Sequence, residues 1–137
     1  MNCNTKVSDC SHKELTKIVN LTIDWCIDNM GYKKKRGLPW IKVSKGKLKK
    51  DPCYAWYIND EHTITVFPAT FVEYKHTLRK FIGIILHEYC HTLQKGGDKK
   101  YLKLSKKYGY WDNPMEVEAR SHEKNWNKCY NEIKNLL

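Results

Sequence analysis

The sequence predicts one α+β domain, residues 1–137, made of three helices and a short block of strands. Apolar residues recur at helical spacing near the start, in the middle and at the end of the chain. Between the first two of these segments, residues 31–69 are rich in β-branched, aromatic and turn residues, which is typical of strands. A chain of 137 residues is long enough to bury a core of its own.

The first helix is expected over residues 12–30, because Ser11 and Glu14 have capping-box spacing before it and Gly31 follows it. Three segments are then expected to be strands: residues 40–43, 53–58 and 62–67. A polar turn at residues 59–61 would join the last two strands as a hairpin. The sheet is therefore expected to be three-stranded and mainly antiparallel.

The second helix is expected to begin at Thr70 or at Thr77 and to end before Gly96. The basic, tyrosine-rich residues 95–112 are expected to form a long loop. Asn113-Pro114 has the composition of a helix start, with Asn at the cap and Pro at the first helical position. A single C-terminal helix is expected to follow.

The chain carries a net charge of +10, and 15 of its 25 basic residues fall in residues 31–50 and 95–107. Such segments attract phosphate backbones or acidic partners, and Lys33-Lys34-Lys35-Arg36 resembles a nuclear-import signal. Lysine outnumbers arginine by 22 to 3, so contact with nucleic acid is expected to be unspecific.

No apolar stretch approaches the ~18 residues of a membrane helix, and the first residues lack the apolar segment of a secretory signal. We therefore expect a cytoplasmic protein with no membrane partner, which would enter the nucleus in a eukaryotic host. Its six cysteines are expected to stay reduced, with Cys26 and Cys129 buried on helical stripes.

The second helix contains His87, Glu88 and His91 in the pattern H-E-x-x-H. Two histidines four residues apart on a helix project from one face and can bind one zinc ion, and the intervening glutamate can take a proton from water. The simpler alternative is two polar residues that pair across a helical turn.

Catalytic zinc usually takes three protein ligands, so a further ligand is needed. Gly97 stands where a metzincin would have its third histidine. The remaining candidates are Glu116, Glu118 and His122, at the start of the last helix. Asn113 and Glu116 also have capping-box spacing, so periodicity alone leaves both carboxylates open.

H-E-x-x-H followed some 25 residues later by Glu-x-x-Ala resembles the gluzincin metallopeptidases, especially the small minigluzincins. Residues 113–120 also resemble the Asn-Pro-x-Glu-x-Glu-Ala signature of small phage and large-DNA-virus peptidases. The resemblance covers roughly residues 55–125. It implies a zincin-like fold, a viral or phage protein, and Glu116 as the third ligand. Arg120 departs from the pattern, because many relatives have Asp or Asn there to hold a ligand histidine.

The resemblance implies a zinc-dependent metallopeptidase that hydrolyses peptide bonds with a zinc-activated water and Glu88 as general base. Four side chains are chemically able to stabilise the oxyanion: Tyr108, Tyr110, Arg120 and His122. By the same resemblance a sheet-edge strand would bind the substrate, and the candidate strand comprises His62, Thr63, Ile64, Thr65, Val66 and Phe67. The substrate would be a protein or peptide, acidic or associated with nucleic acid.

Two rival functions use the same scaffold without catalysis. One is a basic module that binds nucleic acid. The other is a silent zincin scaffold that binds a protein through residues 95–112. The presence of Glu88 favours the enzyme, because a purely structural metal site needs no base.

Overall fold

The computed structural model describes all 137 residues and confirms the α+β class. Six α-helices and three strands follow one another along the chain, with a short 3₁₀ turn near each end. Their bounds are α1 His12–Met30, β1 Trp40–Val43, β2 Ala55–Ile58, β3 Thr63–Val66, α2 Pro68–Glu73, α3 Leu78–Leu93, α4 Gly97–Asp112, α5 Pro114–Glu123 and α6 Trp126–Ile133. None of these helices is both long enough and apolar enough to cross a membrane.

Helix α1 has the predicted bounds because its signals are local. The Ser11 hydroxyl accepts a hydrogen bond from the Glu14 amide at 3.1 Å, and the Glu14 carboxylate accepts one from the Ser11 amide at 2.9 Å. At the other end Gly31 has a φ of 80°, which glycine adopts without a steric penalty. Both caps are therefore formed as the sequence indicates.

The sheet has the order β1-β3-β2 and is mixed. Strands β2 and β3 form the predicted antiparallel hairpin, but β1 runs parallel to β3. The expectation of a mainly antiparallel sheet is therefore wrong. So is the expectation that residues 62–67 form an edge strand, because β3 is hydrogen-bonded on both sides. A hairpin pattern predicts which strands are joined, and it leaves the side on which a third strand pairs undetermined.

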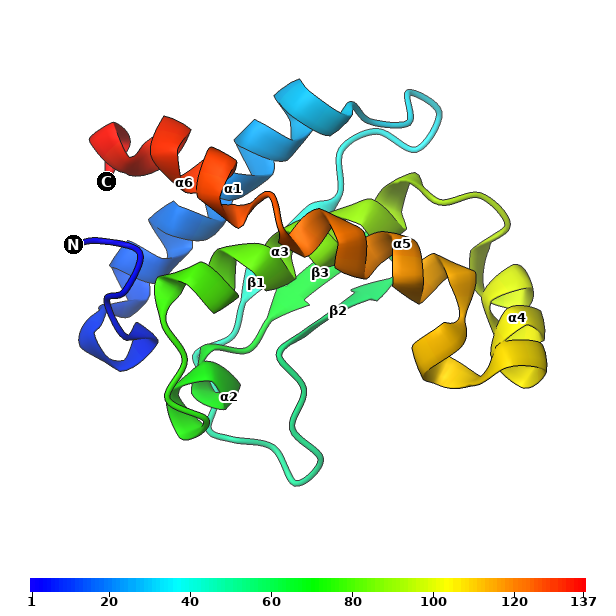
Figure 1. The fold of residues 1–137 in the computed structure, drawn as a ribbon, viewed down its shortest axis with the longest axis horizontal. Helices are drawn as coiled ribbons and strands as arrows, with labels where there is room; N and C mark the ends of the chain where they lie inside the picture. The colour runs from blue at the N-terminus through cyan, green and yellow to red at the C-terminus, as the bar shows by residue number, and fades with distance from the viewer.

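Helix α3 runs through the middle of the molecule, with the sheet on one side and α5 on the other (Figure 1). Helices α1 and α6 lie side by side and pack against α3 as well (Figure 1). As a result every residue from 81 to 90 is buried, on all faces of the helix rather than on one. This central position holds the H-E-x-x-H residues between the sheet and α5.

The predicted second helix is two helices. Thr70 lies inside α2, where its hydroxyl donates to the Cys53 carbonyl at 2.7 Å instead of capping a helix. Thr77 is the N-cap of α3, which ends at Leu93. Cys26 and Cys129 are buried as predicted, and no two cysteines form a disulfide.

Residues 95–112 are mainly helical rather than a loop, because α4 occupies most of them. The helix buries none of its side chains, so it has no apolar stripe that a sequence pattern could reveal, and a φ of 78° at Gly109 interrupts it. The predicted C-terminal helix is likewise divided, into α5 and α6, at residues 124–125.

Candidate metal centre

His87 and His91 lie one turn apart on α3 and turn the same ring atom toward Glu116 on α5. One oxygen of the Glu116 carboxylate, Oε1, is 2.9 Å from His87 Nε2 and 3.2 Å from His91 Nε2. The possible ligand atoms of His87, Glu88 and His91 also lie within 4.8 Å of one another. The group of His87, Glu88 and His91 could therefore hold a metal ion.

The second nitrogen of each ring is fixed by a neighbouring side chain. His87 Nδ1 lies 2.8 Å from Glu123 Oε2, and His91 Nδ1 lies 2.7 Å from Gln94 Oε1. Such partners orient a ligand histidine and leave Nε2 free for a metal. Neither Glu123 nor Gln94 is a site residue in the sequence analysis, yet Glu123 follows Glu116 by two helical turns and so projects from the same face.

Arg120, which departs from the gluzincin-like pattern, is not a hydrogen-bond partner of either histidine. Its guanidinium lies 3.9 Å from the centre of the Trp111 ring and donates to the Trp111 carbonyl. The carboxylate that accepts the hydrogen bond of His87 Nδ1 is therefore that of Glu123, one turn further along α5.

The two candidate carboxylates, Glu116 and Glu118, point in different directions. Glu118 Oε1 accepts from Gln94 Nε2 at 2.9 Å and from the Cys90 thiol at 3.5 Å, and it has no hydrogen bond to His87 or His91. Glu116 is 4% exposed, and its other oxygen accepts a 2.5 Å hydrogen bond from the Tyr101 hydroxyl. The geometry brings Glu116, and not Glu118, to the histidine pair.

The pKa values in this cluster are strongly coupled. Burial alone would lower the pKa of His87, but hydrogen bonds to Glu116 and Glu123 outweigh it and raise that pKa to about 9. Burial alone would raise the pKa of Glu116, but hydrogen bonds from both histidines and Tyr101 hold it well below its usual range. The carboxylates of Glu116 and Glu123 therefore favour a positive charge at the histidine rings, either a proton or a metal ion.

Glu88 is 9% exposed, and no side chain or backbone group of the chain forms a hydrogen bond with its carboxylate. Burial raises the pKa of its carboxyl group to about 7, although both neighbouring histidines act to lower it. The side chain borders an open cleft. A largely buried side chain whose carboxylate opens into a cleft is placed to exchange a proton there.

The cleft has a volume of about 320 Å³ and lies between β2, α3 and the α4–α5 pair. Its lining residues are Ala55, Trp56, Tyr57, Asn59, Glu88, His91, Gln94, Gly97, Asp98, Tyr101, Tyr110, Met115 and Glu116. Among the predicted oxyanion donors, only Tyr110 lines it; Tyr108, Arg120 and His122 do not. Tyr101 lines the cleft and was missed, because α4 gives no sequence signal of its orientation.

Strand β2 forms one wall of the cleft and is an edge of the sheet. The Tyr54 carbonyl accepts from the Phe67 amide, so the backbone groups of Trp56 and Ile58 also face β3 by the alternation of an antiparallel ladder. The backbone groups of Ala55 and Tyr57 then face away from β3. Both residues line the cleft.

Helix α5 packs close to α3 at Gly83, with just enough room left for one methyl group. A Cβ atom at Gly83 would lie 3.4 Å from the Glu123 carbonyl oxygen and 3.7 Å from the Glu123 Cβ. Because His87 is one turn further along α3, this approach brings the Glu123 carboxylate to the His87 ring.

Comparison of the chain with models of protein families, with curated proteins and with solved structures found no match.

Proposed function

We propose that the protein is a zinc-dependent metallopeptidase in which His87, His91 and Glu116 bind Zn²⁺. The observation that carries this proposal is the convergence of two imidazole nitrogens on one carboxylate oxygen, at 2.9 and 3.2 Å. Two histidines and a glutamate are a donor set that suits zinc. The resemblance to gluzincins implies the same three residues as zinc ligands.

The chain's own groups are suited to peptide hydrolysis. A zinc ion in the site would supply Lewis acidity, which activates a water molecule and polarises the scissile carbonyl. Glu88 would take the proton of that water and return it to the leaving amine, for which a pKa raised to about 7 is well matched. Tyr101 would hold Glu116 in place, and the Tyr110 hydroxyl is the candidate donor to the oxyanion.

The substrate peptide is proposed to add to β2 rather than to the central strand β3. The backbone groups of Ala55 and Tyr57 are turned away from the rest of the sheet and border the cleft. An extended peptide could pair with them as an additional antiparallel or parallel strand. Its scissile bond would then lie beside Glu88.

The metal site is tested by measuring zinc per chain with elemental mass spectrometry, on protein purified without a metal-affinity tag. We expect about one zinc in the wild type and in Glu118→Ala, and loss of zinc in Glu116→Ala. Circular dichroism controls for folding of each variant. A folded wild type without zinc, even after zinc is supplied, contradicts the proposal.

Catalysis is tested with zinc-loaded protein on denatured casein and on a quenched fluorescent peptide library. Glu88→Gln should keep its zinc and lose about 10²- to 10⁴-fold in rate. Equal rates in the two proteins would contradict the role of Glu88. If the zinc-loaded wild type cleaves neither probe, the silent scaffold becomes the better explanation.

A further inference from the structure

One face of the sheet carries no helix. Paired residues on neighbouring strands point to the same side, and the inner side, with Ile64 and Val66, packs on the core beneath α1 and α3. The outer side consists of Trp40, Lys42, Thr63, Thr65, Trp56 and Ile58. None of these six residues is acidic.

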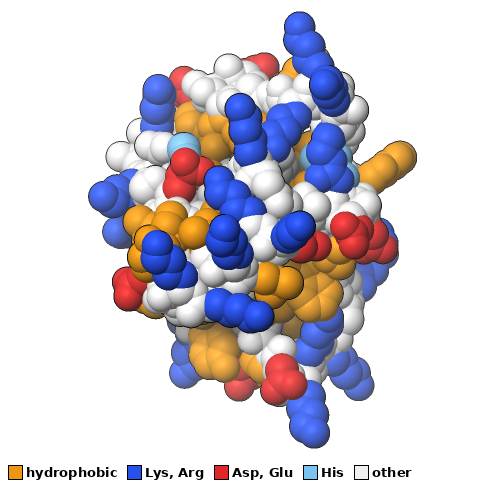
Figure 2. All heavy atoms as spheres, turned by 90° about the vertical axis from the view of Figure 1, so that its right-hand side faces the viewer, with side chains coloured by type: hydrophobic (Ala, Val, Ile, Leu, Met, Phe, Trp, Pro, Cys, Tyr) orange, Lys and Arg blue, Asp and Glu red, His pale blue; other side chains and the backbone are white.

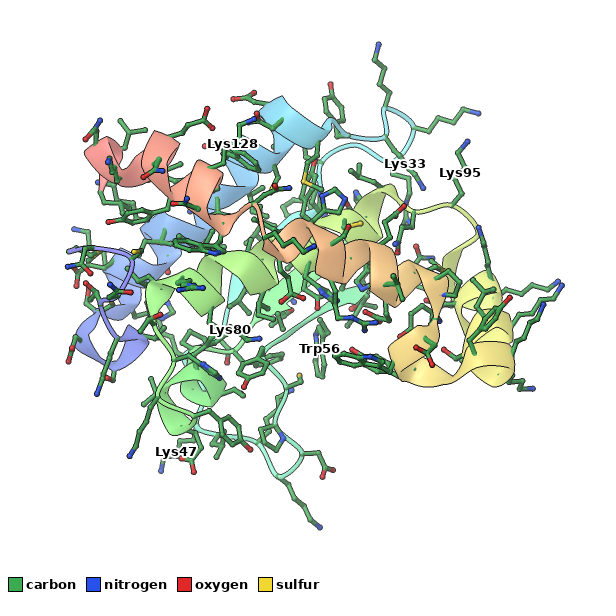
Figure 3. The ribbon with its side chains drawn as sticks, viewed as in Figure 1. Lys33, Lys47, Trp56, Lys80, Lys95 and Lys128 are labelled. Carbon is green, nitrogen blue, oxygen red and sulfur yellow. The ribbon has the colours of Figure 1, made fainter.

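Two tryptophans stand on this outer face: Trp56 packs edge-on against Phe67, with the ring centres 4.8 Å apart, whereas the Trp40 ring has no aromatic partner. Trp40 is 74% exposed and Trp56 is 39% exposed. Trp56 extends from β2 on the side away from α3 (Figure 3). The small side chains of Thr63 and Thr65 lie on the strand between them. The Trp40 ring is therefore open to a stacking partner, and the Trp56 ring is open on the part that Phe67 and Lys49 leave uncovered.

The surroundings of this face are strongly basic. Residues 31–50, which include β1, contain nine lysines and arginines and no acidic residue. Lys42 lies on the face itself, and the Lys49 ammonium group sits 4.0 Å from the centre of the Trp56 ring. Lys47 extends from the loop that follows β1 (Figure 3). Basic side chains are also widespread on the α4 end of the molecule, with acidic ones among them (Figure 2).

We propose that this outer face of the sheet binds single-stranded nucleic acid. Bases would stack on the rings of Trp40 and Trp56, and the surrounding lysines would contact the phosphates. Aromatic rings on an open sheet face can stack only on bases that are unpaired, and the bases of a duplex are not available for this. A second copy of this chain is a poor occupant, because two such faces would bring like charges together.

Binding is expected to be independent of base sequence. All three arginines, the side chains that best read base edges, are engaged within the chain. Arg36 donates to Asn59, Arg79 lies 4.7 Å from the Trp126 ring centre, and Arg120 lies against Trp111. The free cations are lysines, which act on phosphates as point charges. This binding uses none of the proposed zinc ligands, so it is measured without zinc, although Trp56 also lines the cleft.

The test is fluorescence anisotropy with labelled single-stranded DNA and RNA of about 12 nucleotides, and with the matching duplexes, at several salt concentrations. Trp40→Ala should weaken single-strand binding by about 5- to 150-fold, which corresponds to the loss of one stacked base. Trp111→Ala, which removes a similarly exposed tryptophan (67%) on α4, is the matched control and should bind as the wild type does. Trp40 is chosen because it lies outside the cleft.

The charge contribution is tested with Lys42→Gln/Lys45→Gln against Lys13→Gln/Lys17→Gln on α1. The first pair should weaken binding and flatten its salt dependence, whereas the second should change neither. Equal binding by Trp40→Ala and the wild type overturns the proposal, as does tighter binding of duplex than of single strand. Anionic vesicles or polyglutamate that bind as tightly as the oligonucleotides, with the same loss in Trp40→Ala, would also overturn it in favour of another partner.

Discussion

Two histidine clusters border the same cleft and use their ring nitrogens in different ways. His62 is 8% exposed; its Nε2 lies 2.9 Å from the Gly37 carbonyl and its Nδ1 lies 2.7 Å from the hydroxyl of Tyr57, a cleft residue. His87 is 7% exposed, and its two nitrogens face the carboxylates of Glu116 and Glu123. The two histidines are therefore equally buried, but their hydrogen-bond partners differ.

This difference separates a structural histidine from a candidate ligand. A neutral imidazole donates from one nitrogen and accepts at the other, which a carbonyl and a hydroxyl satisfy completely at His62. Between two carboxylates, which only accept, the ring of His87 is satisfied when it carries an extra proton or when Nε2 binds a metal ion. The partners of a buried histidine thus say more about its role than its burial does.

The largest expected effect separates these two histidines directly. His87→Ala should lose stoichiometric zinc, because the site loses one of its three ligands. His62→Asn should keep the zinc, because His62 is not a ligand. Asparagine tolerates the φ of 48° at this position, so the variant should lose only hydrogen bonds, which lowers the free energy of unfolding by about 1–3 kcal/mol. Zinc per chain and urea unfolding measure the two outcomes.

If His62→Asn also emptied the site of zinc, the cluster around Tyr57 would have to be part of the metal centre, and the comparison would fail. His76→Asn is a useful further control. Its ring bonds the Tyr54 hydroxyl at 2.7 Å, as a structural histidine would.

The next effect concerns the partners of the ligand rings. Glu123→Gln should weaken zinc binding by about 10- to 100-fold, because the amide orients His87 without raising its basicity. Gln94→Ala should have a similar effect through His91. Glu118→Gln is the matched control on the same helix. Competition with a chromophoric chelator measures the zinc affinities. If Glu123→Gln bound zinc as tightly as the wild type, the Glu123 carboxylate would not contribute to the metal site.

The stability of the metal-free protein and its affinity for zinc should change with pH in opposite directions above pH 6.5. The pKa of His87 rises from 6.5 to about 9 on folding, so its contribution to stability is complete below pH 6.5 and is lost as the pH rises through about 9. The pKa of Glu116 is lowered from 4.5, so its contribution is present above that pH and is lost below it. The pair of His87 and Glu116 therefore stabilises the metal-free chain most between pH 4.5 and 6.5.

Zinc competes with the proton on His87, so its affinity should grow as the pH rises. Thermal unfolding of metal-free and zinc-loaded protein from about pH 5 to about pH 9 should show a widening difference in melting temperature. If the difference in melting temperature became smaller as the pH rises, zinc would not be replacing the proton on His87.

The fold was predictable where its signals are local. The ends of α1 follow from Ser11, Glu14 and Gly31, which lie within a few residues of the bonds that they make. The position of β1 in the sheet depends on pairing across more than 20 residues, as between Trp40 and Thr63, and no local pattern determines it. Helix α4 was missed because packing on α5, rather than a buried stripe, holds it.

The same distinction applies to the site. His87, Glu88 and His91 share one helix, so their spacing predicts that they lie together. The approach of Glu116 depends on how α5 packs on α3, which only family resemblance could suggest. Two signals were present but unused: Gln94 lies three residues after His91, and Glu123 lies seven after Glu116, both at helical spacing.

The smallest effect is expected from Gly83→Ala. The new methyl group would meet Glu123 at 3.4 to 3.9 Å, which is ordinary contact, and alanine favours a helix over glycine by about 1 kcal/mol. Stability should therefore change by less than about 1 kcal/mol, and zinc affinity should stay as in the wild type. Gly83→Val places further atoms against the Glu123 backbone and should push α5 from α3. Because Glu116 and Glu123 belong to the same helix, that displacement weakens both of their bonds to His87 at once. If Gly83→Val bound zinc like Gly83→Ala, the close packing of α5 on α3 would not be what brings the carboxylates to the ring.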